Sequence, residues 1–218
     1  MTLYIGKLFI VSAASGVGKT SLVQQIINKI DNIVLSISHT TRPKRPKEQD
    51  GVDYFFIDQK TFLQMKNNQE FLENAEVFGN YYGTSKKFVI DSINQGKDVI
   101  LEIDYQGTNQ IKNHPIFSFF SNQEKSKIDC LSIFILPPSL QTLTNRLTSR
   151  GQDTPFVIQQ RLNNEKKEMG HYIDYDFLVI NDNFNHAAEE LTAIINVQRL
   201  TLVRQQVVHA SLINSLLV

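Results

Sequence analysis

The sequence is poor in cysteine, and this shortage excludes a stabilising disulfide framework. Cys130 is the only cysteine among 218 residues, so no disulfide can form within the chain, as is typical of proteins from a reducing compartment. Because Cys130 adjoins the apolar run of residues 131–136, we expect it to be a small buried residue and not a reactive thiol.

The sequence also lacks surplus charge and long apolar runs. It carries 22 Lys and Arg against 22 Asp and Glu, a formal net charge of zero, whereas general nucleic-acid binders usually show a basic excess. No stretch reaches the roughly 18 apolar residues that indicate a membrane span, and residues 1–9 do not resemble a secretory signal. We therefore expect a cytoplasmic protein that binds neither nucleic acid nor membrane.

Short apolar runs alternate with helical patterns along most of the chain. This alternation predicts a single α/β domain with a parallel sheet and right-handed crossovers. From residue 187 to 217 the apolar residues recur with a helical period, so we expect this tail to pack on the core or on another subunit. The predicted strands are residues 8–11, 33–37, 99–103, 132–136 and 177–180, and the predicted helices are 20–30, 140–148 and 156–169.

Two regions interrupt this alternation. Residues 38–96 carry clusters of Arg, Pro, Tyr and Gly with short strand-like pieces, which indicates an inserted substrate subdomain. A polar hinge inside an Arg-bearing helical pair indicates a mobile lid over residues 146–170. Residues 113–129 show no clear period and are predicted to form a surface excursion. The predicted core comprises residues 1–37, 97–145 and 171–218.

A phosphate-binding loop is predicted between the first strand and the first helix. Residues 13–20 match the Walker A pattern, except that Ala13 replaces its first glycine. Gly16 and Gly18 allow the backbone to turn its amides inward, where they and the helix N-terminus hold phosphate oxygens. Lys19 supplies positive charge to the β- and γ-phosphates, and the Thr20 hydroxyl is a ligand for Mg²⁺. The predicted ATP-binding residues here are Ala13, Ala14, Ser15, Gly16, Val17, Gly18, Lys19, Thr20 and Ser21.

GTPases, ATPases and many kinases share such a loop, so the second substrate must be predicted from the rest of the chain. Arg42 and Arg45 are three residues apart, so both guanidinium groups can bind one anion. Tyr54 and Tyr82 follow in the same region, and tyrosine hydroxyls donate to phosphate. Singly, a surface arginine is usually solvated and a tyrosine usually lies at a core edge. The ordered series between two predicted core strands indicates a nucleotide site.

Four segments, taken in order, closely resemble signatures of the guanylate kinases. They are Ser38-His39-Thr40-Thr41-Arg42, Asn80-Tyr81-Tyr82-Gly83-Thr84, Ile103-Asp104-Tyr105-Gln106-Gly107 and Val179-Ile180-Asn181-Asp182. The resemblance covers nearly the whole chain. It implies a P-loop NTPase-type α/β fold with an inserted GMP-binding subdomain and a helical lid. It also implies an enzyme that transfers the γ-phosphoryl group of ATP to GMP and dGMP, with Mg²⁺, in purine nucleotide metabolism.

The resemblance assigns the GMP contacts by position. For Glu73 the chemistry agrees, because an ionised carboxylate can accept from both guanine N1–H and the guanine 2-amino group. Adenine presents an acceptor at N1 and no amino group at C2, and polar sites of this kind discriminate strongly. Arg42, Arg45, Tyr54 and Tyr82 are implied to hold the GMP phosphate, and Ser38, Glu73, Thr84 and Asp104 to contact guanine.

The resemblance also implies the ATP-side and lid contacts. Arg150 and Arg161 are lid arginines that close over the phosphates, Arg146 supports the nucleotide site, and Asn181 contacts the adenine. Phosphoryl transfer needs positive charge on the moving group and exclusion of water, and lid closure supplies both. The predicted catalytic residues are Lys19, Arg42, Arg150 and Arg161.

One departure from the family pattern concerns the metal site. Glu102 stands where family members often carry aspartate, and an acid at a strand C-terminus can orient a water bound to the Mg²⁺ held by Thr20.

Two alternatives to a GMP kinase stay open. One is an inactive interaction module, which commonly lacks an intact phosphate loop. The other is a kinase for AMP or a pyrimidine nucleotide, against which Glu73 and Ser38 weigh. His39 is expected to be structural or solvated, and homo-oligomerisation stays open.

Overall fold

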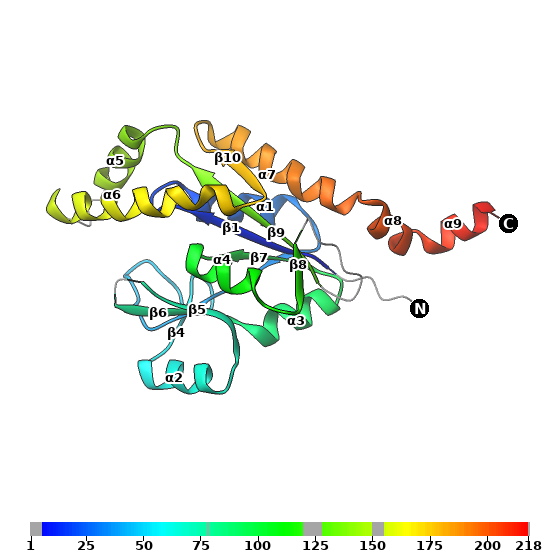
Figure 1. The fold of residues 1–218 in the computed structure, drawn as a ribbon, viewed down its shortest axis with the longest axis horizontal. Coiled ribbons are helices and arrows are strands. Elements are labelled where there is room, and N and C mark those ends of the chain that lie inside the picture. The colour runs from blue at the N-terminus through cyan, green and yellow to red at the C-terminus, as the bar shows by residue number, and fades with distance from the viewer. Residues whose placement is uncertain (1–5, 78, 120–127, 150–154, 218) are drawn as a thin grey trace.

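The computed structural model describes residues 6–77, 79–119, 128–149 and 155–217, without the side chains of residues 118–119 and 155–161. Its main sheet lies at the centre of the molecule (Figure 1). The strand order is β10-β9-β1-β7-β2, β8 pairs with the start of β9, and all these pairings are parallel. The strands are β1 (Leu8–Ala13), β2 (Ile33–Leu35), β7 (Asp98–Glu102), β8 (Phe117–Phe119), β9 (Ile128–Leu136) and β10 (Phe177–Ile180).

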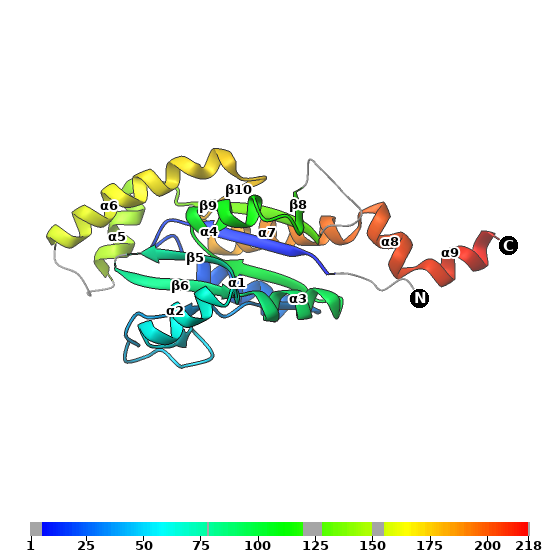
Figure 2. The same cartoon turned by 60° about the horizontal axis from the view of Figure 1, so that its bottom comes forward.

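Helices cover both faces of this sheet (Figures 1 and 2). Phe9 and Val11 of β1 pack in a cluster with one set of helices, whereas Leu8 and Ile10 pack in a second cluster with the other set. This alternation follows from the two-residue period of a strand that is buried on both faces. The first set is α1 (Lys19–Lys29), α5 (Leu140–Ser149), α6 (Pro155–Gly170) and α7 (Phe184–Arg199), and the second is α3 (Lys86–Asn94) and α4 (Tyr105–Lys112).

The predicted strands and helices of the core are confirmed within a few residues, but one strand was missed. Residues 113–129 were expected to form a surface excursion, yet Phe117 is 4% exposed and begins β8, which pairs with residues 128–130 of β9. A three-residue strand is too short to show a period in the sequence. The part of the excursion from 120 to 127 lies outside the described residues.

A second sheet contains most of the region predicted as the substrate subdomain. Its order is β4-β3-β6-β5, and α2 (Gln59–Asn67) packs on it through Phe62, which stacks on Phe71 at 4.7 Å. In contrast, α3 of the same predicted region packs into the core of the main sheet through Val89 and Ile93. The division at residues 38–96 stays a prediction. The strands are β3 (His39–Thr40), β4 (Phe55–Phe56), β5 (Phe71–Val77) and β6 (Asn80–Ser85).

The C-terminal helices begin at a buried ion cluster and then leave the body of the protein. Asp98 of β7 is fully buried and binds Arg199 Nε at 2.8 Å and an Arg204 guanidinium nitrogen at 3.0 Å. From this cluster, α8 (Leu202–Val208), which contains Arg204, and then α9 (Ala210–Leu217) lead away from the main sheet (Figures 1 and 2). No residue of α9 is buried. The prediction that the tail packs on the core is confirmed for α7, whose Ala187, Ala188, Leu191 and Ile195 lie in the core cluster, and is wrong for α9.

The prediction that Cys130 is a small buried residue is confirmed. Cys130 is 4% exposed, and burial raises the pKa of its thiol well above the ordinary value, which leaves little reactive thiolate. None of the described helices has both the length and the apolar character to span a bilayer.

Candidate active site

The predicted site residues gather where the parallel strands of the main sheet end. The phosphate loop follows β1, Asp104 lies two residues after the end of β7, and Asn181 directly follows β10. The carboxyl ends of parallel strands meet at one edge of a sheet, where α/β proteins bind their ligands. The second sheet supplies the remaining candidates from β3, β5 and β6 and their connections.

The phosphate loop has the backbone geometry that its sequence predicts. Gly16 and Gly18 adopt φ values of 91° and 102°, in the left-handed region that favours glycine. Gly18 precedes the first residue of α1 and has no side chain that could cap it, which leaves the first-turn amides for an anion. Ala13 pairs with Ile135 as the last residue of β1, so the missing glycine falls in the strand and not in the tight part of the loop.

Two predicted ATP-site residues support the loop from outside. The carbonyl oxygen of Val17 accepts hydrogen bonds from an Arg146 guanidinium nitrogen at 3.0 Å and from Asn181 Nδ2 at 2.7 Å. A Cβ atom on Gly18 would lie 2.9 Å from the same Asn181 nitrogen, so this close approach also requires glycine. Arg146 and Asn181 thus hold the loop backbone. The contact between Asn181 and adenine stays a prediction.

Thr20 and Glu102 place two oxygen-bearing side chains in contact beside the phosphate loop. Thr20 Oγ1 donates to Glu102 Oε2 at 2.8 Å, while Glu102 Oε1 is buried and has no hydrogen-bond partner among the described residues. Mg²⁺ prefers hydroxyl, carboxylate and water oxygens and usually takes only one or two ligands from the protein beside the phosphates of a substrate. The residues present fit a hydrated Mg²⁺, and the extra methylene of Glu102 does not prevent its contact with Thr20.

The four residues predicted to hold the GMP phosphate form one group, in which both arginines contact the carboxylate of Glu48 and the tyrosines follow from Arg42. Glu48 Oε1 is 2.7 Å from an Arg42 guanidinium nitrogen and 3.9 Å from one of Arg45, and Glu48 Oε2 accepts from the Arg45 amide at 2.8 Å. The Arg42 guanidinium lies 5.4 Å from the ring centre of Tyr54, and the rings of Tyr54 and Tyr82 are 5.9 Å apart. The structure therefore brings this predicted set together.

Glu48 was not among the site residues predicted from the sequence. Burial disfavours its ionised form, but hydrogen bonds from Arg42 and from the Arg45 amide outweigh burial and lower the pKa of Glu48. The ionised carboxylate thus holds both arginines close together before any phosphate arrives. An acid three residues after an arginine in a charged loop is common, so the sequence carried no distinguishing signal.

The predicted guanine contacts centre on Glu73. This residue of β5 is 4% exposed, and its cross-strand partner Thr84 donates from Oγ1 to Glu73 Oε1 at 2.5 Å. Burial raises the pKa of Glu73 to about 7, against the hydrogen bond from Thr84 and together with the nearby charge of Asp104. Asp104 caps the N-terminus of α4 by accepting from the Gly107 amide at 2.9 Å.

Gly107 is a second residue that sequence reasoning did not single out. A Cβ atom at this position would lie 2.6 Å from Glu73 Oε2, so only glycine lets α4 approach the buried carboxylate. Gly107 belongs to one of the four family-like segments, but glycine is required there because of a contact between distant parts of the chain.

Ser38 is half-buried beside β3, and its contact with guanine stays a prediction. His39 stacks on Phe55 at 4.9 Å, which confirms a structural role.

The lid arginines are not placed by the structure. Arg150 lies outside the described residues, and the side chain of Arg161 on α6 is also outside them. Their roles stay predictions that depend on the position of α6.

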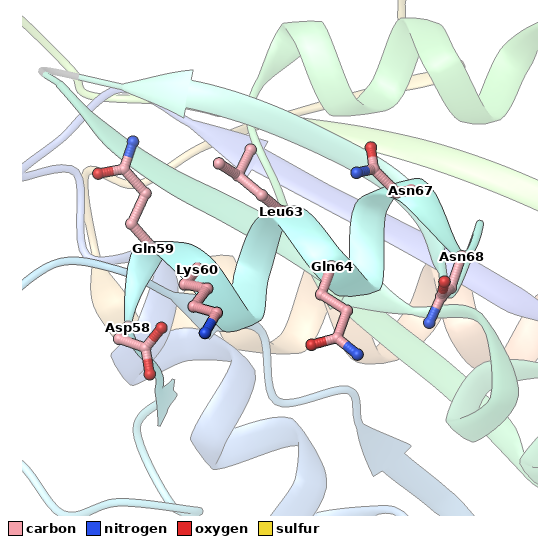
Figure 3. A pocket seen from close by; sticks show the side chains of 7 residues that line it. All are labelled: Asp58, Gln59, Lys60, Leu63, Gln64, Asn67 and Asn68. Carbon is pink, nitrogen blue, oxygen red and sulfur yellow. The ribbon is translucent and has the colours of Figure 1, made fainter.

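A depression elsewhere on the protein lies along α2, between Asp58 and Asn68, and is formed by that helix and its ends (Figure 3). None of the predicted site residues lines it, so it is not part of this site.

Comparisons with known proteins identify similar chains. The family model described as Guanylate kinase matches residues 5–198. A guanylate kinase of Hahella chejuensis is 50% identical over 202 residues, covering 93% of this chain and 91% of that protein. One of Legionella pneumophila is 45% identical over 212 residues, covering 97% and 96%. The crystal structure of guanylate kinase from Anaplasma phagocytophilum has 29% sequence identity and a TM-score of 0.71, covering 92% of this chain and 89% of that one.

Proposed function

This chain belongs to the guanylate kinase family and transfers a phosphoryl group from ATP to GMP, and from that premise we propose how its residues divide the work. The enzyme binds and positions two substrates and forms no covalent intermediate, because the phosphate of GMP is already an anionic nucleophile. We also propose that it acts in the cytoplasm, on the ground of its single buried cysteine.

Arg42, Arg45, Tyr54 and Tyr82 bind the phosphate of GMP and direct one of its oxygens at the γ-phosphate of ATP. The contact of Arg42 and Arg45 with the carboxylate of Glu48 supports this role, because both arginines are held together at a site that already accommodates an anion. Such positioning lowers the barrier by removing the entropy cost of bringing the reacting atoms together.

In the ATP site, residues 13–21 hold the phosphates, and Lys19 places its positive charge next to the β- and γ-phosphates. Arg146 and Asn181 keep this loop in shape through the Val17 carbonyl. Thr20, with Glu102 acting through a bound water, would hold Mg²⁺, which would neutralise charge on the phosphate oxygens. Closure of the lid then brings Arg150 and Arg161 to the transferring group.

The observation that carries the choice of acceptor is the buried carboxylate of Glu73. Thr84 occupies one of its oxygens, and the other lies beside Gly107 at the start of α4. This carboxylate accepts hydrogen bonds from guanine N1–H and the 2-amino group, whereas an adenine in the same place would leave it poorly paired.

We predict that Glu73→Gln lowers kcat/KM for GMP. Glutamine is nearly isosteric but exchanges one acceptor oxygen for an NH₂ donor, so that a donor faces a donor on guanine. By analogy with base-edge pairs in DNA recognition the cost is about 1–3 kcal/mol, or roughly 5- to 150-fold in kcat/KM. Steady-state assays with GMP and AMP measure it, with the exposed Glu76→Gln of the same strand as control. An unchanged GMP value in a folded Glu73→Gln protein would remove Glu73 from the base site.

The pKa of Glu73 also predicts a pH dependence. Free Glu73 titrates at about 7, and guanine binds its ionised form, so GMP affinity rises as pH rises through 7. Below that value the ionised fraction, and with it the affinity, falls about tenfold per pH unit. Calorimetric titration with GMP between pH 6 and 8 measures this change and the proton released on binding.

The phosphate of GMP itself titrates near pH 6, by analogy with phosphorylated side chains, so the wild-type profile contains two contributions. Glu73→Gln retains only that of the phosphate, and the difference between the two profiles isolates Glu73. Parallel profiles for wild type and Glu73→Gln would contradict the assignment.

A further inference from the structure

Two carboxylates one helical turn apart connect α6 with both substrate loops. Glu165 accepts a hydrogen bond from the backbone amide of Ser15 at 2.7 Å, and Glu168 accepts one from the backbone amide of Tyr105 at 2.9 Å. Ser15 belongs to the phosphate loop. Tyr105 is the first residue of α4 and directly follows Asp104 on the guanine side. One helix of the predicted lid therefore touches the ATP loop and the GMP loop at once.

Neither carboxylate has the surroundings of an ordinary surface acid. Glu165 is 7% exposed, and burial raises the pKa of Glu168 against the hydrogen bond from Tyr105. Burying a carboxylate is costly unless it is hydrogen-bonded, and a loop amide supplies a hydrogen bond to each of these two residues. A second contact strengthens the guanine-side connection, because the ring of His171, just after α6, stacks on Tyr105 with ring centres 3.5 Å apart.

These contacts fix the C-terminal half of α6. Figures 1 and 2 show that α6 extends beyond the end of the main sheet. Glu165 and Glu168 lie in its C-terminal half, whereas Arg161 lies four residues before Glu165, about one turn closer to the outer end. The anchored half therefore sets the distance and rotation from which a residue at position 161 reaches the phosphates.

We propose that Glu165 and Glu168 are positioning residues that align the lid helix with the ATP loop and the GMP loop respectively. Glu165 acts through the Ser15 amide on the phosphate loop, and Glu168 acts through the Tyr105 amide on the loop that carries Asp104. The inference rests on the proposed lid role of α6 and adds to it the two fixed points about which the lid is oriented.

The test compares four variants, Glu165→Ala, Glu165→Gln, Glu168→Ala and Glu168→Gln, by kcat and by KM for each substrate at saturation of the other. A displacement of about 1 Å can cost 10²-fold in rate. Glu165→Ala is expected to lower kcat about 10- to 100-fold and to raise the KM for ATP more than that for GMP. Glu168→Ala is expected to raise the KM for GMP more than that for ATP.

Each glutamine keeps an acceptor oxygen at the same reach, so the Gln variants are expected to recover most of the loss. A merely structural role would lower the melting temperature without this split between substrates and without rescue. The exposed Lys166→Ala on the same helix is the control for changes in its charge. If an alanine variant fails to fold, the shorter Glu165→Asp or Glu168→Asp, which withdraws the acceptor oxygen, replaces it in the comparison with the Gln variant.

Three outcomes would overturn the inference: unchanged kinetic constants in both alanine variants, equal effects on both KM values, or tighter ATP binding by Glu165→Gln than by wild type. The last outcome would show that the carboxylate competes with the phosphates. Arg161→Ala, measured in parallel, distinguishes a failure of the positioning role of the two glutamates from a failure of the lid role of α6. A large loss of kcat in Arg161→Ala beside unaffected Glu165 variants rejects only the positioning role, whereas full activity of Arg161→Ala rejects the lid role itself.

Discussion

Replacing either lid arginine by alanine is expected to lower kcat by roughly 10³- to 10⁵-fold, the range for an arginine that stabilises a transferring phosphoryl group. GMP binding should weaken far less, because Arg42 and Arg45 still hold its phosphate. The large loss of kcat is expected because Arg150 and Arg161 reach the reacting group only after the lid closes. They therefore stabilise the transition state more than the bound substrates.

The measurement is kcat and the dissociation constant of GMP for Arg150→Ala and Arg161→Ala. Arg161→Lys keeps the charge but loses the planar fork, so an intermediate kcat is expected. Lys166→Ala removes a positive charge from an exposed position of the same helix and serves as the matched control. Small and equal effects on kcat and on GMP binding would mean that both arginines are ordinary surface residues.

Replacing Lys19 by methionine is expected to lower kcat by at least about 10²- to 10³-fold, the cost of removing one preorganised group that stabilises transition-state charge. Lys19 is the only lysine of the phosphate loop and the first residue of α1, so no neighbouring lysine of that loop can replace its charge. Methionine has a similar length and no charge, and the fold and the GMP side should be preserved.

Kinetics, GMP titration and thermal unfolding of Lys19→Met check this expectation together. The matched control is Lys29→Met, which removes an exposed lysine from the last turn of the same helix and should keep full turnover. A Lys19→Met protein that retained most of its activity would place the ATP site elsewhere.

Much of the site could be predicted because its residues are local in sequence. Gly16, Gly18 and Lys19 form the phosphate loop within a few positions, and the buried strands around them have strong apolar runs. The convergence of Arg42 with Tyr82 could be predicted only through the family resemblance, because 40 residues separate them in the sequence.

What could not be predicted depends on contacts between distant segments. Gly107 is required by its distance to Glu73, and Glu165 is defined by the amide of Ser15, 150 residues earlier. Neither leaves a periodic or compositional signal. The acid Glu48 is local but resembles any solvated charge in a loop until its two hydrogen bonds to arginine groups are seen.

The most direct test of the whole site is a comparison of phosphoryl acceptors with the purified chain. A coupled assay would measure kcat/KM for GMP, dGMP, AMP and UMP with saturating ATP and Mg²⁺. GMP and dGMP are expected to be good substrates, because the predicted contacts involve only the base and the phosphate. AMP and UMP should be lower by roughly 10⁴-fold, the discrimination of a site whose buried polar groups would otherwise be left unpaired. A kcat/KM for AMP close to that for GMP would contradict the reading of guanine by Glu73 and the site built around it.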